Sequence, residues 1–217
     1  MHKDLSPLSG TGICAIIRIK TQNVDIESLV NSLVHGGINA VEVSFDTIDA
    51  ISLIKSIRNY ADRKVLLGAG TILNTDAAQS AIDAGAQFLV SPHLDINLLK
   101  FSEKREIPFI PGVFTPNEIV NAWQNGAKIV KLYPAVACGP EYIKVLKNGP
   151  FSQIIFMAVG GITLSNAKDY IKSGADILGI GGALVNEKLV SDQNWNIVQK
   201  NARQFIEIVK SARSKND

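Results

Sequence analysis

The sequence predicts an α/β protein, a single (β/α)8 barrel of the TIM type that occupies residues 1–217. Short segments that are apolar at nearly every position alternate with segments of helical periodicity, and eight such pairs follow one another. Strands of this kind, separated by helices, are typical of a parallel sheet whose outer face the helices cover. Eight pairs leave about 27 residues for each, a compact arrangement with little room for a second domain or a large lid.

The expected strands and helices can be placed by their apolar patterns. The strands are short apolar runs at 13–19, 40–43, 64–67, 88–90, 107–110, 128–133, 154–159 and 177–180. The helices show apolar residues at three- and four-residue spacing, at 24–35, 49–57, 76–84, 96–103, 116–124, 140–147, 165–173 and 194–212. Glycines that relieve the left-handed backbone at a helix end recur at matching distances, since 48 residues separate Gly37 from Gly85 and Gly126 from Gly174. That distance is about two strand–helix pairs and indicates an internal repeat.

An open, doubly wound sheet is the alternative arrangement for alternating strands and helices. Such sheets usually have five or six strands and carry a glycine-rich nucleotide-binding turn after the first strand. This chain has eight expected strands, and its first strand is followed by the glycine-free segment Lys-Thr-Gln-Asn at 20–23. The closed barrel is therefore favoured.

Composition and charge exclude several classes of protein. Hydrophobic residues make up 46% of the chain and charged residues 19%, so the chain is globular and not disordered. Lys and Arg number 22 and Asp and Glu 20, a balance that favours neither nucleic acid nor an anionic membrane as a partner. Cys14 and Cys138 belong to no metal-binding or disulfide pattern. With no secretory signal and no apolar run of about 18 residues, a cytoplasmic protein is expected.

Two charged residues interrupt the apolar strands. Because successive side chains of a strand point to opposite faces, Glu42 lies on the other face from the bulky Val41 and Val43. If the valines face the helices, Glu42 points into the barrel, and the same pattern places Lys131 there. A lysine removed from water has a lowered pKa, and its neutral amine can form a Schiff base with a ketone. A nearby carboxylate can then act as general acid and base. The residues alone also allow an interior ion pair without a catalytic role, or a Lys131 that reaches the rim.

Two glycine pairs follow the last two expected strands. They are Gly160-Gly161 and Gly181-Gly182, and barrels often place a phosphate site in the loops after strands seven and eight. Backbone amides without neighbouring side chains can cradle a phosphate, although either pair alone is also common in tight turns. Together they predict a phosphorylated small-molecule ligand.

Three further polar residues lie where strands end. The Thr71 hydroxyl can contact substrate or cap the helix that follows. Arg18 can hold a carboxylate through its planar guanidinium or form a salt bridge at the rim. His93 can act as a base, but a lone histidine in a loop is usually only a surface residue.

The ordered series of motifs resembles the 2-keto-3-deoxy-6-phosphogluconate (KDPG) and 4-hydroxy-2-ketoglutarate (KHG) aldolases. The matching stretches are GGI leading to VEV (36–43), GAGT (68–71), GAQFLVSP (85–92), IPGV with TP (110–116), VKLYPA (130–135) and GGI (160–162). The resemblance implies a class I aldolase without metal or other cofactor, in a barrel that commonly assembles as a homotrimer. It implies cleavage of KDPG to pyruvate and glyceraldehyde 3-phosphate, and in some members of KHG.

The resemblance also implies roles for individual residues. Lys131 becomes the Schiff-base lysine and Glu42 the acid/base group. Thr71, Pro92 and Tyr133 become substrate-binding positions, and the two glycine pairs become the phosphate site.

Several positions depart from the typical family pattern. Where the family has Glu-Val-Thr-Leu-Arg-Thr, with an arginine that meets the substrate carboxylate, this chain has Glu-Val-Ser-Phe-Asp-Thr at 42–47, so that the charge is reversed at Asp46. In addition, Tyr133 replaces a phenylalanine, Val159 a threonine and Ala183 a serine.

Other features resemble the sister 2-keto-3-deoxy-6-phosphogalactonate aldolases. These also lack that arginine, carry one on the first strand as Arg18 does here, and share a stretch like Gly-Pro-Glu-Tyr-Ile-Lys at 139–144. The hypothesis is that Arg18 takes over carboxylate recognition and that the galactonate epimer is the alternative substrate. A phosphosugar isomerase, a thiamine-phosphate-synthase-like barrel and, because of Asp46, a catalytically silent sugar-phosphate sensor are the competing functions.

Overall fold

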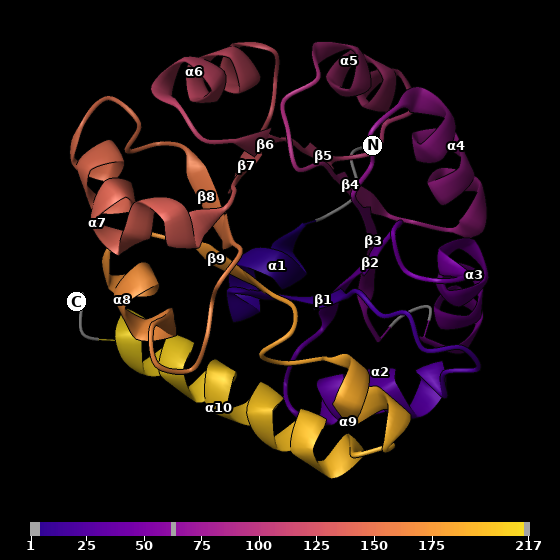
Figure 1. The fold of residues 1–217 in the computed structure, drawn as a ribbon. Coiled ribbons are helices and arrows are strands. Elements are labelled where there is room, and N and C mark those ends of the chain that lie inside the picture. The colour runs from indigo at the N-terminus through magenta and orange to yellow at the C-terminus, as the bar shows by residue number, and fades with distance from the viewer. Residues whose placement is uncertain (1–4, 62–63, 215–217) are drawn as a thin grey trace.

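The computed structural model describes residues 5–61 and 64–214, and its strands form one parallel sheet. Figure 1 shows the strands around the centre, the helices α2 to α10 in a ring outside them, and α1 in the middle of the view. The strands are β1 (Ile13–Ile17), β2 (Ala40–Ser44), β3 (Leu66–Gly70), β4 (Phe88–Val90), β5 (Phe109–Ile110), β6 (Gly112–Val113), β7 (Ile129–Leu132), β8 (Ile155–Val159) and β9 (Ile177–Ile180). The helices are α1 (Ser6–Thr11), α2 (Ile26–His35), α3 (Ala50–Ala61), α4 (Thr75–Ala84), α5 (Ile96–Lys104), α6 (Pro116–Gln124), α7 (Ala135–Asn148), α8 (Ala167–Lys172), α9 (Glu187–Ser191) and α10 (Trp195–Arg213). Within the described ranges, no helix has the length and apolar character needed to cross a membrane.

Pro111 joins β5 and β6 into one extended segment that closes the barrel. β5 pairs with β4 and β6 pairs with β7, so the same stretch of chain contacts both of its neighbours. Proline has no backbone N–H, which explains the interruption at this residue. Its carbonyl still accepts a hydrogen bond from the Lys131 amide at 2.8 Å. With the segment counted once, eight strands in the described part of the chain surround the axis, and the predicted (β/α)8 barrel is confirmed.

The third strand begins and ends later than its expected apolar run. The prediction places it at 64–67, whereas β3 ends at Gly70 and contains two glycines. A Cβ at Gly68 would overlap the Phe88 ring, and one at Gly70 would overlap the Glu42 carboxylate. Only glycine fits at these two positions of the strand, because larger side chains from neighbouring strands occupy the space where a Cβ would lie.

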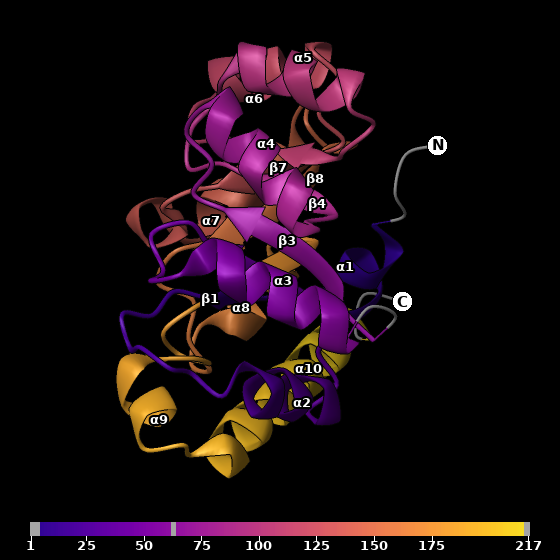
Figure 2. The ribbon, with the colours of Figure 1, turned by 90° about the vertical axis from the view of Figure 1, so that its right-hand side faces the viewer.

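Two short helices, α1 and α9, do not appear in the sequence-based prediction. With six and five residues, they are too short to show helical periodicity. α1 lies beside one end of the barrel (Figure 2) and directly precedes β1, so it covers the end at which the strands begin. Its Leu8 is completely buried and packs with residues of the barrel interior such as Cys14 and Phe88.

Side chains of the strands alternate between two apolar layers, as expected for a covered barrel. Val41 and Val43 belong to the outer layer between strands and helices, whereas Ala40 belongs to the inner layer. The inner layer comprises Leu8, Cys14, Ile16, Ala40, Leu66, Phe88, Val90, Ile110, Ile129, Met157, Val159 and Ile177. This alternation directs Glu42 and Lys131 inward, into an interior that is otherwise mostly hydrocarbon.

Candidate active site

Among the residues that the structure describes, Glu42 on β2 and Lys131 on β7 are the two charged side chains that are buried. Glu42 is completely buried, and only 2% of Lys131 is exposed. The Lys131 Nζ lies 5.0 Å from the centre of the Tyr133 ring, just past the end of the same strand. Within the described residues, neither carboxylate oxygen of Glu42 has a hydrogen-bond partner. Lys131 therefore does not reach the rim, and the two charged groups are not joined in a direct, hydrogen-bonded ion pair.

Burial shifts the pKa values of both groups toward their neutral forms. It raises the pKa of Glu42, and the positive charges of Lys131 and Arg18 act in the opposite direction. Burial also lowers the pKa of Lys131, although the charge of Glu42 opposes this shift. The barrel thus contains an amine that loses its proton more easily than a lysine in water, together with a carboxyl group that keeps its proton more easily. Such a pair can provide a nucleophile and can transfer protons.

Cys14 on β1 is a third titratable group inside the barrel. It is completely buried, and its burial, followed by the charge of Glu42, raises the pKa of the thiol well above its ordinary value. Only the thiolate is a strong nucleophile. Cys14 therefore packs as an apolar residue, whereas burial favours the neutral form of the Lys131 amine, the form that can act as a nucleophile.

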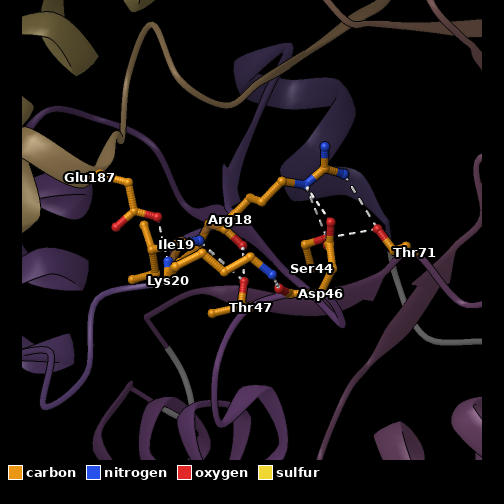
Figure 3. A network of polar contacts seen from close by, with 9 residues as sticks. Arg18, Ile19, Lys20, Ser44, Asp46, Thr47, Thr71 and Glu187 are labelled. Atoms are coloured by element: carbon orange, nitrogen blue, oxygen red, sulfur yellow. Dashed lines mark hydrogen bonds and ion pairs between the residues drawn. The ribbon is translucent and has the colours of Figure 1, made fainter.

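A polar network occupies the carboxyl ends of β1, β2 and β3 (Figure 3). The Arg18 guanidinium lies 3.3 Å from an Asp46 carboxylate oxygen and 3.4 Å from both the Ser44 and the Thr71 hydroxyls. Ser44 is completely buried, donates to Asp46 and lies 2.7 Å from the Thr71 hydroxyl. Ser44 has no role in the sequence-based prediction, but the alternation that places it on the same face as Glu42 is a signal that could have identified it.

The structure resolves the two roles that the sequence leaves open for Thr71. Asn74 is the residue that caps α4, because its side chain accepts a hydrogen bond from the Ala77 amide at 2.8 Å. Thr71 has a φ of 59°, in the left-handed region that is uncommon for a β-branched residue, and its hydroxyl points to Ser44 and Arg18. Thr71 thus belongs to the polar network and is not a helix cap.

Pro92 and Tyr133 follow the ends of β4 and β7. Tyr133 is half-buried beside the lysine amine. Backbone atoms of Pro92 pack against Gly112, where a Cβ would overlap them. His93 is exposed and its Nδ1 lies 3.0 Å from the Ser91 hydroxyl, a geometry that supports its interpretation as a surface residue.

The two glycine pairs lie in neighbouring loops. Gly160-Gly161 follows β8 and Gly181-Gly182 follows β9, and these two strands are paired in parallel. The side chains of Asn166 and Asn186 donate to the carbonyl of the second glycine of each pair, at 2.8 and 3.1 Å. A Cβ at Gly182 would meet open space. The loops are thus fixed by local hydrogen bonds at the same end of the barrel as the polar network.

No metal site accompanies these residues in the described ranges. Nowhere in them do three or more His, Cys, Asp or Glu side chains gather in a way that could hold a metal ion. The chemistry that the site offers rests on an amine, a carboxyl group and hydrogen-bond donors.

Comparisons with known proteins agree with this arrangement. The family model of the KDPG and KHG aldolases matches residues 6–201. The KHG/KDPG aldolase of Escherichia coli (strain K12) is 36% identical over 180 residues, which are 82% of this chain and 84% of that protein. The protein of Rhizobium meliloti (strain 1021) named "Probable 2-dehydro-3-deoxy-6-phosphogalactonate aldolase" is 30% identical over 160 residues, 74% of this chain and 76% of that protein.

A solved structure adds a chemical observation. The KDPG aldolase of Legionella pneumophila, described as holding pyruvate as a covalent carbinolamine intermediate, superimposes with a TM-score of 0.85 at 29% identity. The match covers 91% of this chain and 95% of that one. The chain therefore belongs to the KDPG and KHG aldolase family, whose members are carbon–carbon lyases.

Proposed function

We propose that the protein is a class I aldolase that cleaves KDPG to pyruvate and glyceraldehyde 3-phosphate and also accepts KHG. The observation that carries this proposal is the buried Lys131 amine, whose pKa is lowered by burial and which shares the barrel interior with Glu42. The covalent pyruvate intermediate described for the Legionella relative supports the same chemistry. We further propose that the protein is cytoplasmic and that, as the resemblance to the family implies, it forms a homotrimer.

In the proposed reaction, the neutral Lys131 amine attacks the C2 ketone of the substrate. The resulting carbinolamine loses water and becomes an iminium ion, which accepts electrons from the neighbouring carbon–carbon bond. Glu42, acting through a water molecule, removes the proton of the C4 hydroxyl, and the C3–C4 bond breaks. The aldehyde product leaves, the enamine is protonated at C3, and water then releases pyruvate and restores the lysine.

Glu42 is suited to move these protons because its two oxygens are not committed to other groups. Both are buried, and neither has a hydrogen-bond partner within the described chain. The raised pKa of Glu42 lets the group hold a proton after it has removed one from the substrate. Proton removal and return can therefore be carried out by one side chain.

The remaining residues are proposed to bind the substrate. The amides around Gly160-Gly161 and Gly181-Gly182 would receive the phosphate, and the guanidinium of Arg18 would receive the carboxylate. Thr71, Pro92 and Tyr133 would contact the carbon chain between these two ends.

The galactonate epimer of KDPG is a second candidate substrate. Asp46 stands where an arginine is expected in KDPG aldolases, and the Arg18 guanidinium lies in that region of the site. The similarity to the Rhizobium meliloti protein favours the same alternative. An isomerase or a silent sensor would have no use for the buried lysine, and its presence favours the aldolase over both.

Borohydride trapping tests the proposed nucleophile. In the presence of pyruvate, sodium borohydride is expected to reduce the iminium ion and to leave a stable adduct on Lys131, detected by peptide mass mapping. The Lys131→Met variant should form no adduct and lose cleavage activity. Lys128→Met is the matched control, because Lys128 is exposed, and it should behave like the wild type. An active enzyme with no adduct at Lys131 would overturn the proposal.

Replacing Glu42 by glutamine should separate Schiff-base formation from bond cleavage. The amide preserves the shape of the side chain but cannot take a proton, so kcat should fall about 100- to 10,000-fold. The pyruvate adduct at Lys131 should still form. The matched control is Glu141→Gln on the exposed face of α7. A Glu42→Gln enzyme with wild-type kcat would remove Glu42 from the mechanism.

Turnover of the two epimers decides the substrate. We expect a higher kcat/KM for KDPG than for its galactonate epimer, and the reverse order would establish the alternative. Equal turnover of the epimers would show that the departures around Asp46 carry no selectivity.

Replacing Arg18 by alanine tests its proposed role in carboxylate binding. Arg18→Ala should raise KM for the preferred substrate about tenfold or more, because charge-assisted hydrogen bonds are lost. The control is Arg203→Ala on the exposed face of α10. An unchanged KM in Arg18→Ala would exclude Arg18 from carboxylate binding.

A further inference from the structure

The Arg18 guanidinium is held at two of its three nitrogens. Its Nε lies 3.3 Å from the Asp46 Oδ2 and donates to the Ser44 hydroxyl at 3.4 Å. Its Nη2 donates to the Thr71 hydroxyl at 3.4 Å. In the described part of the chain, Nη1 has no acceptor, and Figure 3 shows it pointing away from the other residues of the network. The protein thus occupies one edge of the guanidinium and leaves its outer end open.

Asp46 is itself fixed from two directions. The buried Ser44 hydroxyl donates to its Oδ1, and the Lys20 ammonium donates to its backbone carbonyl. Burial tends to raise the pKa of Asp46, but the hydrogen bond from Ser44 and the charge of Arg18 outweigh it and keep the pKa below the usual value. Asp46 is therefore an ionised and anchored partner for the arginine.

A guanidinium can bind carboxylates at more than one edge because its five N–H donors lie in one plane. Asp46 takes the Nε–H, and Thr71 accepts from one of the two N–H groups of Nη2. The other N–H of Nη2 and the N–H groups of Nη1 remain for a second, bidentate carboxylate. An arginine without such an anchor would lose more side-chain freedom when it binds a ligand. The position of Asp46 thus prepares Arg18 for an anion.

We propose that Asp46 is a positioning residue that holds Arg18 so that its outer end receives the 2-keto acid carboxylate of the substrate. This inference rests on the proposed aldolase function and adds a residue to it. The pair formed by Arg18 and Asp46 replaces a single arginine as the carboxylate-recognition device. If Asp46 instead only neutralised the charge of Arg18, it would weaken anion binding, and replacing Asp46 would increase the affinity for the substrate carboxylate.

The pyruvate dependence of borohydride trapping at Lys131 tests this role without contributions from phosphate binding or bond cleavage. In Asp46→Asn, the pyruvate concentration that gives half-maximal trapping should rise about tenfold, and the rate at saturation should stay unchanged. Acetone is the carboxylate-free probe, and its trapping should be the same in both proteins. Asp46→Glu keeps the carboxylate, and it should therefore bind pyruvate more tightly than Asp46→Asn does.

A double-mutant cycle distinguishes positioning from a general structural effect. Arg18→Gln should weaken pyruvate trapping at least as much as Asp46→Asn, and the double variant should be no weaker than Arg18→Gln alone. Asp83→Asn is the matched control, because Asp83 is exposed on α4 and accepts a hydrogen bond from Gln79 at 2.7 Å.

The failures of the two proposals can be told apart. If wild-type protein traps pyruvate but Asp46→Asn binds it equally well or more tightly, the role of Asp46 is refuted and the aldolase function stands. Additive effects in the cycle, or an equal loss with acetone, would also refute it. If the wild type traps no pyruvate at Lys131, the aldolase function fails and the role of Asp46 fails with it.

Discussion

The barrel buries an amine and a carboxyl group together in one hydrocarbon interior, and this burial determines the chemistry that the candidate site can offer. Removing charges from water is expensive, and a group that lacks a close partner responds by shifting its pKa toward the neutral form. Glu42 and Lys131 are buried in this way, and neither oxygen of the carboxylate is hydrogen-bonded within the described residues. The barrel thereby favours a neutral amine and a protonated carboxyl group, which are the properties that the proposed nucleophile and proton carrier need.

The barrel provides this environment through the residues next to each group. Gly70 leaves space for the Glu42 carboxylate, and Pro111 accepts a hydrogen bond from the Lys131 backbone while it joins the two parts of the closing segment. Leu8 of α1 packs against the inner layer at the end where the strands begin, whereas the polar network and the glycine loops follow the carboxyl ends of the strands. The hydrogen-bond donors proposed to receive an anionic substrate thus lie at the carboxyl ends of the strands. A few local donors are consistent with the near-zero net charge of the chain.

Alternating and helical patterns of apolar residues predict the fold and the inward direction of Glu42 and Lys131, because both follow from the spacing of residues along the sequence. Alternation along β2 and β7 is enough to direct Glu42 and Lys131 inward. The network at the barrel mouth is different, since Arg18, Ser44 and Thr71 lie at the carboxyl ends of β1, β2 and β3 and meet only when these three strands pair. Likewise, the extent of β3 depends on the large side chains that neighbouring strands place beside its glycines, and α1 is too short to leave a periodic signal.

The pH dependence of pyruvate trapping at Lys131 shows whether burial in the barrel activates this amine. Because burial lowers the pKa of this amine, its neutral form should accumulate at lower pH than that of a free lysine. With cyanoborohydride as reductant, the trapping rate should rise with pH and reach its plateau well below the ordinary lysine pKa of about 10.4. A rate that continues to rise through the ordinary lysine range would show that the barrel does not activate Lys131 and would contradict this account.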